Sequence, residues 1–234
     1  MRKNKFITTL KAAFPHTLPV LAGFLVLGIA YGVLMKTKGY NVIWAVLMSA
    51  IAFCGSMQFV AITLLTTIFS PAQAFILSLM VNARHLFYGV SLLDKYRGLG
   101  KVRPFLIYTM CDETFSIVSS VEVPEGIDRK YFYFIISALD YFYWVFGSFL
   151  GGVAGEFVKF NTKGMDFVLT ALFVVLFLEQ MKKHENWKLG IIGILSTMFG
   201  LLLFKRDNFV IPSMVIILVV LLAIRPKSEQ GGAP

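Results

Sequence analysis

Five ionisable side chains stand in the interior of long apolar stretches of this sequence. They are Arg84, His85, Asp112, Glu113 and Asp140. A charged group at the centre of a bilayer costs about 2.5–3.5 kcal/mol even on lenient insertion scales, so such groups normally pair with one another or face a cavity. The chemistry that these residues could perform is therefore ion pairing, proton transfer or the binding of a charged solute.

The charges in these stretches do not balance. Arg84 supplies one fixed positive charge, whereas the three carboxylates would supply three negative charges. At least one carboxyl group is therefore expected to be protonated or solvated by a cavity. Such a group, together with His85, could load and release protons, and an amino acid needs one anionic and one cationic partner. The alternative is a buried ion pair of Arg84 with one carboxylate that only fastens two helices together.

Polar side chains accompany the charges at helical spacing. Asn82 shares a helical face with His85 at i, i+3, and Tyr88 shares a face with Arg84 at i, i+4. The following apolar segment would carry a polar stripe at i, i+4 and i+8, formed by Tyr108, Asp112 and Ser116. These residues join the charged groups as candidates for substrate binding or coupling.

A small polar run, Gly55-Ser56-Met57-Gln58, interrupts an otherwise apolar segment. Gly55 permits a break in the backbone, and Ser56 and Gln58 offer hydrogen-bond donors and acceptors. The ends of two half-helices at such a break could hold a carboxylate or an ammonium group. A contact of small residues between two helices would produce the same pattern, so both interpretations stay open.

The elements that must position these residues are membrane helices. The chain is 57% hydrophobic with a mean hydropathy of +0.75, above the roughly 45–50% apolar content of soluble domains. Its apolar runs approach the length of about 20 residues that a helix needs to cross a bilayer, and they lack the alternation of a β-barrel. The sequence predicts an all-α, polytopic membrane protein with about seven or eight transmembrane segments. The candidate spans are 17–35, 42–69, 71–93, 104–121, 131–155, 167–178, 189–204 and 209–224.

Two candidate spans do not fit a single uninterrupted crossing. The segment 42–69 contains the polar run at 55–58, and the segment 167–178 has only 12 residues before Glu179-Gln180. Broken or re-entrant helices of this kind often form the binding site of a transporter. A glycine-rich helix, a Lys-Gly turn and an apolar run occur in both halves, which indicates a possible internal twofold repeat of 17–121 and 131–224.

The rest of the chain is expected to carry no separate domain. Residues 1–16 read as a basic cytoplasmic segment before a retained first helix, 17–224 as one transmembrane domain, and 225–234 as a disordered polar tail. The net charge of +9 lies in short connections, where it indicates topology and contact with membrane lipids rather than nucleic-acid binding. Cys54 and Cys111 lie in apolar segments, so we expect no disulfide, metal site or cofactor. No Gly-x-Ser-x-Gly or His-Glu-x-x-His motif points to an enzyme.

Three motifs in this sequence resemble the AzlC-type branched-chain amino acid permease family, the large subunit of LIV-E type exporters. They are residues 55–59 (GSMQF), 82–89 (NARHLFYG) and 112–115 (DETF). The likeness extends over about residues 15–224. It implies a multi-pass protein of the bacterial plasma membrane that exports leucine, isoleucine and valine, and methionine or related analogues in some members, driven by the proton-motive force. It also implies a separate small membrane subunit of the AzlD type.

Other functions are compatible with the same residues. A channel or facilitator for another small solute would use a polar stripe and a broken helix equally well. A purely structural subunit predicts that neutralising Asp112, Glu113 or Asp140 changes only the abundance of the protein. Export, rather than import, comes from the resemblance alone.

Overall fold

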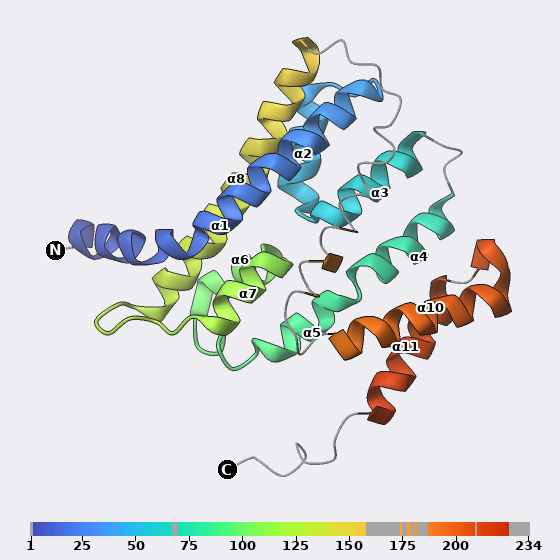
Figure 1. Cartoon of the computed structure of the whole chain (residues 1–234). Coiled ribbons are helices and arrows are strands. Elements are labelled where there is room, and N and C mark those ends of the chain that lie inside the picture. The colour runs from blue at the N-terminus through green and yellow to red at the C-terminus, as the bar shows by residue number, and fades with distance from the viewer. Residues whose placement is uncertain are drawn as a thin grey trace. The chain divides into compact units, whose positions relative to one another are not determined.

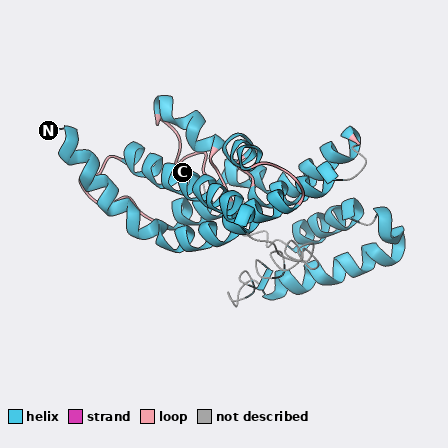
Figure 2. Cartoon of the chain, turned by 90° about the horizontal axis from the view of Figure 1, so that it is seen from above, coloured by secondary structure: helices cyan, strands magenta, loops and turns pink. Residues whose placement is uncertain are grey.

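The structure is a computed structural model of the chain, and it describes residues 2–66, 70–157, 174, 177–178, 181, 187–208 and 210–224. It divides into two compact units, Met1–Asp166 and Phe167–Pro234 (Figure 1). The regular elements of the described residues are all helices (Figure 2). The first unit holds α1 (Arg2–Thr37), α2 (Val42–Ala52), α3 (Gly55–Thr66), α4 (Pro71–Asn82), α5 (Arg84–Ser91), the short 3-10 helix η1 (Gly100–Val102), α6 (Arg103–Tyr108), α7 (Asp112–Ser120) and α8 (Arg129–Phe157), and the second holds α10 (Trp187–Asn208) and α11 (Val210–Ile224).

Three described helices are long and apolar enough to cross a membrane. They are Phe6–Thr37 in α1, Arg129–Phe157, which is α8, and Trp187–Phe204 in α10. Shorter apolar helices, among them α2 and α3, accompany them. The prediction of an all-helical membrane protein is therefore confirmed, whereas the number of crossings and the twofold repeat stay predictions.

The first unit is organised around the packing of α1 against α8 (Figure 1). Gly28 and Gly32 on α1 face Gly147 and Gly151 on α8, so the contacts recur every four residues on each helix. A Cβ atom on Gly28 would lie 2.9 Å from the backbone nitrogen of Ser148, which is closer than real side chains approach. Membrane helices use such small-residue repeats because they let two backbones come into direct contact.

Three apolar segments are each broken into two helices. The breaks fall at residues 53–54 between α2 and α3, at 83 between α4 and α5, and at 109–111 between α6 and α7. Phe53 adopts the left-handed conformation, with φ of 36°, which ends α2. The predicted interruption of segment 42–69 is thus present, and it begins just before the glycine of the 55–58 run.

The other two breaks correct the sequence-based expectation. Segments 71–93 and 104–121 were expected as continuous spans, but each contains a break and neither break holds a glycine or proline, the usual sequence signals of a kink. The predicted polar stripe is also wrong, because the helix is interrupted between Tyr108 and Asp112. Those two residues belong to different helices.

Side chains from neighbouring helices satisfy backbone groups that the breaks leave without helical partners. The Tyr141 hydroxyl donates to the carbonyl oxygen of Ala50 near the end of α2. The single hydrogen of the Tyr108 hydroxyl is shared between the carbonyl oxygens of Ala50 and Ile51, the latter at 2.8 Å. An unpaired carbonyl away from water is costly, so these tyrosines stabilise the end of α2.

The second unit is described only in part. There α10 packs against α11, with Gly200 facing Ser213. The predicted re-entrant segment 167–178 lies outside the described residues except for 174, 177 and 178, and the predicted tail 225–234 lies wholly outside them. The predicted cytoplasmic segment 1–16 is continuous with the rest of α1 from Arg2 onward.

Candidate functional site

The three sequence motifs lie at the three helix breaks. Ser56 is in the first turn of α3, Arg84 is the first residue of α5, and Asp112 is the first residue of α7. Arg84 joins all three breaks, because its Nη2 donates to Ser56 Oγ at 3.0 Å and its Nη1 forms an ion pair with Asp112 Oδ2. Residues that are far apart in the sequence therefore form one cluster, which we call the break cluster: Ser56, Asn82, Arg84, His85, Tyr88, Asp112 and Glu113.

A second contact ties the first two breaks together. Cys54 Sγ donates to the side-chain oxygen Oδ1 of Asn82 at 2.7 Å. His85 Nδ1 lies 3.2 Å from the backbone oxygen of Asn82. The thiol of Cys54 and the imidazole of His85 thus contact the side-chain oxygen and the backbone oxygen of Asn82, the last residue of α4.

The start of α7 favours the anionic half of the ion pair. Asp112 and Glu113 occupy the first turn of α7, where the positive end of the helix favours carboxylates. Arg84 starts α5 one residue after the end of α4, and its ion pair with Asp112 provides a counter-charge for both groups. Arg84 thus forms the expected ion pair with one carboxylate, that of Asp112.

The ion pair keeps unused hydrogen-bonding atoms. The side chains of Arg84 and Asp112 are 36% and 27% exposed. Within the described part of the chain, the buried atoms Arg84 Nε and Asp112 Oδ1 have no hydrogen-bond partner. The two charged side chains are thus partly exposed, although these two atoms are buried. A small solute that carries both charges could reach the exposed parts of the pair.

An aromatic wall borders this ion pair. The ring of Tyr88 on α5 stacks on that of Phe115 on α7, with centroids 4.4 Å apart and planes 19° apart. His85 meets Tyr88 edge to face at 5.6 Å. Apolar ring surface thus lies beside the charged groups, as in binding sites that hold a charged head and an apolar side chain.

Gln58 lies in a buried hydrogen-bond network formed with α2 and α8. It is 1% exposed. Its Oε1 accepts from Trp144 Nε1 at 2.8 Å, and its Nε2 donates to Ser49 Oγ at 2.9 Å, which in turn donates to Ser148 Oγ. Both ends of the amide are therefore used within the protein. Gly55 also lies against this network, since a Cβ there would be 3.1 Å from the Trp144 ring.

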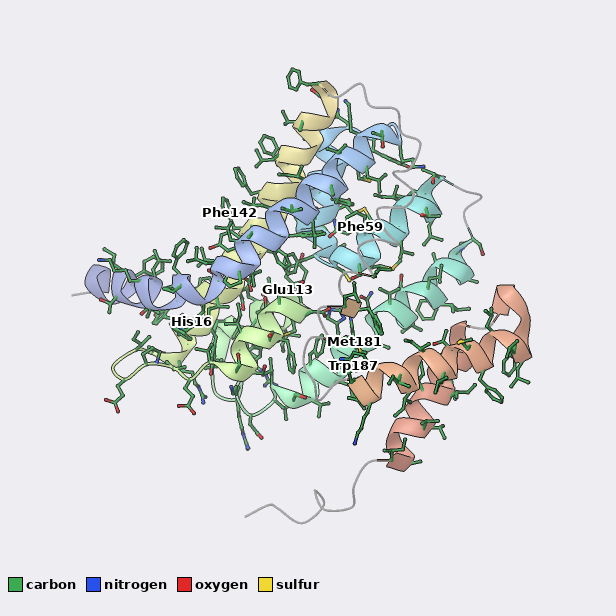
Figure 3. The ribbon with its side chains drawn as sticks, viewed as in Figure 1. His16, Phe59, Glu113, Phe142, Met181 and Trp187 are labelled. Carbon is green, nitrogen blue, oxygen red and sulfur yellow. The ribbon has the colours of Figure 1, made fainter. Side chains whose placement is uncertain are left out.

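The remaining two carboxyl groups are placed differently from Asp112. Glu113 stands partly exposed in the first turn of α7 (Figure 3). Asp140, in the middle of α8, is fully buried, and its Oδ2 accepts a hydrogen bond of 2.7 Å from Thr114 Oγ1. Among the described residues, neither forms an ion pair. Only one of the three carboxylates is thus neutralised by Arg84.

Sequence reasoning missed two residues of this region. Thr114 connects α7 to Asp140, and Phe115 completes the aromatic wall. Both belong to the Asp-Glu-Thr-Phe motif at 112–115, so the motif itself was the available signal. A threonine or a phenylalanine in an apolar segment has no feature that distinguishes it from ordinary packing, and only its contacts assign it to the site.

Comparison with known proteins places the chain among membrane transport proteins. A family model described as "AzlC protein" matches residues 19–158. The chain is 46% identical to the branched-chain amino acid transport protein AzlC of Bacillus subtilis, over 98% of this chain and 91% of that protein. Membrane proteins of Helicobacter pylori and Haemophilus influenzae are 38% and 37% identical, over 97% and 93% of this chain and 99% and 90% of theirs. No solved structure matches.

Proposed function

Because the chain belongs to the AzlC family and is a multi-pass protein of a bacterial membrane, we propose that it is a secondary transporter that exports branched-chain amino acids. Leucine, isoleucine and valine are the proposed substrates, with methionine and related analogues as further ones. The proton-motive force is the proposed energy source, and a small AzlD-type membrane subunit is the proposed partner.

The Arg84–Asp112 ion pair at the helix breaks is the observation that carries this proposal. A zwitterionic amino acid presents one carboxylate and one ammonium group, and the pair presents the complementary charges on two partly exposed side chains. A guanidinium group binds carboxylates through several donors, and charge-assisted hydrogen bonds are about twice as strong as neutral ones. The amino acid would therefore bind with its carboxylate at Arg84 and its ammonium at Asp112.

The neighbouring groups of the break cluster complete the proposed site. Ser56 and Asn82 would fix the orientation of the polar head, since both already contact groups at the breaks. The stacked rings of Tyr88 and Phe115 would face the branched aliphatic side chain. His85 packs on Tyr88 and would hold that ring in place. Selectivity for apolar side chains then follows from ring surface that offers them no polar partner.

Efflux from vesicles tests the proposal. The chain is reconstituted with its small partner, the vesicles are loaded with labelled leucine, and efflux is followed before and after the proton gradient is collapsed. We expect gradient-dependent efflux that is lost in Asp112→Asn at an unchanged protein level. Glu125→Gln is the matched control, because it makes the same chemical change at an exposed position outside the cluster.

The other results have distinct meanings. Leucine efflux that does not change when the proton gradient is collapsed would identify a facilitator rather than a coupled exporter. A loss of protein in Asp112→Asn, with the remaining molecules transporting normally, would identify a structural ion pair. No leucine flux in the unmodified protein would refute the proposed substrate.

A further inference from the structure

A buried carboxyl group lies next to the break cluster but takes no part in its ion pair. Asp140 on α8 is fully buried. Its Oδ2 accepts one hydrogen bond, from Thr114, and its Oδ1 has no partner among the described residues. An ionised carboxylate in such surroundings normally has a cation or several donors around it, because burial of an unpaired charge is costly. The arrangement therefore needs a physical explanation.

The groups that face Asp140 do not supply a positive charge. Those that act on it electrostatically, or that it acts on, are the side chains of Glu113, Cys111, Tyr96 and Tyr143. All four are acids or neutral groups. The nearest arginine of the cluster, Arg84, is paired with Asp112. Within the described residues, no lysine or arginine comes within ion-pair distance of Asp140.

Further buried hydroxyl groups lie on the same side of α8. Ser137 stands one turn before Asp140 and is fully buried. The buried Tyr96 hydroxyl interacts with Ser137 and lies within electrostatic reach of Asp140. These oxygen atoms can accept a hydrogen bond from a carboxylic acid, which has an O–H donor that the carboxylate lacks.

We propose that Asp140 binds the proton that drives transport, at a site separate from the one that binds the amino acid. This rests on the transport function proposed above. In the protonated state the carboxylic acid carries the proton on Oδ1. On release the proton leaves to water, and the carboxylate that remains accepts a stronger, charge-assisted hydrogen bond from Thr114 Oγ1.

Thr114 connects the proton site to the substrate site. Asp112, the anionic half of the ion pair, is in the same helical turn of α7, two residues before Thr114. A change in the strength of the hydrogen bond between Thr114 and Asp140 therefore acts on the turn that positions Asp112. Proton loading and amino acid binding are coupled through this turn, and coupling of this kind is reciprocal between the two sites.

Exchange and gradient-driven efflux separate the two sites experimentally. Exchange of labelled for unlabelled leucine without a proton gradient needs the substrate site alone. Net efflux against a leucine gradient also needs the proton site. For Asp140→Asn, which keeps the size of the side chain but cannot ionise, we expect exchange within about twofold of the unmodified protein and a fall of about tenfold or more in gradient-driven efflux. Exchange by this variant should also lose its dependence on pH.

Three further variants keep the test decisive if Asp140→Asn does not reach the membrane. Thr114→Val removes the hydroxyl and should shift the pH at which efflux is half-maximal, whereas Thr114→Ser should restore the original profile. Glu125→Gln removes a carboxylate at an exposed position outside the break cluster and should stay coupled.

Three results would overturn the assignment. These are normal gradient-driven efflux by Asp140→Asn, an unchanged pH profile in Thr114→Val, and equal uncoupling by the Glu125→Gln control. Absence of leucine exchange in the unmodified protein would refute the transport function itself, so the two failures are distinguishable.

Discussion

Replacing Gly151 by alanine tests whether α1 and α8 pack backbone against backbone. A Cβ atom at this position would lie 2.6 Å from the Cα atom of Ile29 and 2.7 Å from its carbonyl carbon. Both are backbone atoms, so no change of rotamer can relieve the contact. The carbonyl oxygen of Ile29 would be closer still, and because ordinary contact begins at 3.4 Å, the two helices would have to separate locally by at least about 0.8 Å.

The size of the effect follows from this separation. A gap of about 0.5–1 Å forfeits a quarter to a half of each van der Waals contact along the seam. Forcing extra carbon into a packed interior typically costs about 1–3 kcal/mol. Alanine also favours a helix by about 1 kcal/mol over glycine, which would hide part of the loss.

A matched variant removes that complication. Gly23→Ala lies on α1, and a Cβ there would meet no atom within 4 Å. Gly23→Ala therefore gains the higher helix propensity of alanine without a steric clash. We expect the free energy of unfolding of Gly151→Ala to be lower than that of Gly23→Ala by about 1–3 kcal/mol.

Denaturant titration of the purified protein in mixed micelles measures this difference, with tryptophan fluorescence as the signal. Trp144 lies on α8 and reports the loss of its buried contacts. Equal stability of the two variants would refute the close approach of α1 and α8.

Three further substitutions test individual contacts. Arg84→Lys keeps the charge but loses the planar fork that contacts two helices at once, so we expect leucine efflux to fall by about tenfold at an unchanged protein level; unchanged efflux would show that a point charge is sufficient. Gln58→Leu leaves Trp144 Nε1 buried without its acceptor and should lower the free energy of unfolding by about 1–3 kcal/mol in the same titration, while leucine binding is kept. Lys95→Met removes the donor to the carbonyls of residues 118 and 119 at the end of α7 and should lower the free energy of unfolding by about 0.3–1 kcal/mol, with Lys95→Arg nearer the original value.

The sequence by itself determined the type of element and pointed to most of the residues that meet in the break cluster. Long apolar runs must be helical in a membrane, since lipid offers no partner to backbone polar groups. Charged residues inside such runs are costly enough to indicate function, and Arg84 and Asp112 were identified on that ground. The polar run at 55–58 likewise indicated the break that ends α2, because glycine and short polar side chains are local features of the chain.

The tertiary structure decided where the other breaks fall and which groups meet. The breaks at 83 and 109–111 contain none of the residues that normally mark a kink, and they form where side chains such as Asn82 and Tyr108 find partners on other helices. The sequence alone is compatible with an ion pair between Arg84 and any of three carboxylates. In the structure α5 lies against the start of α7, so Arg84 pairs with Asp112, and Asp140 on α8 has no ion-pair partner among the described residues. Local sequence cannot specify such pairings, because the distance between two side chains on different helices depends on how the helices pack.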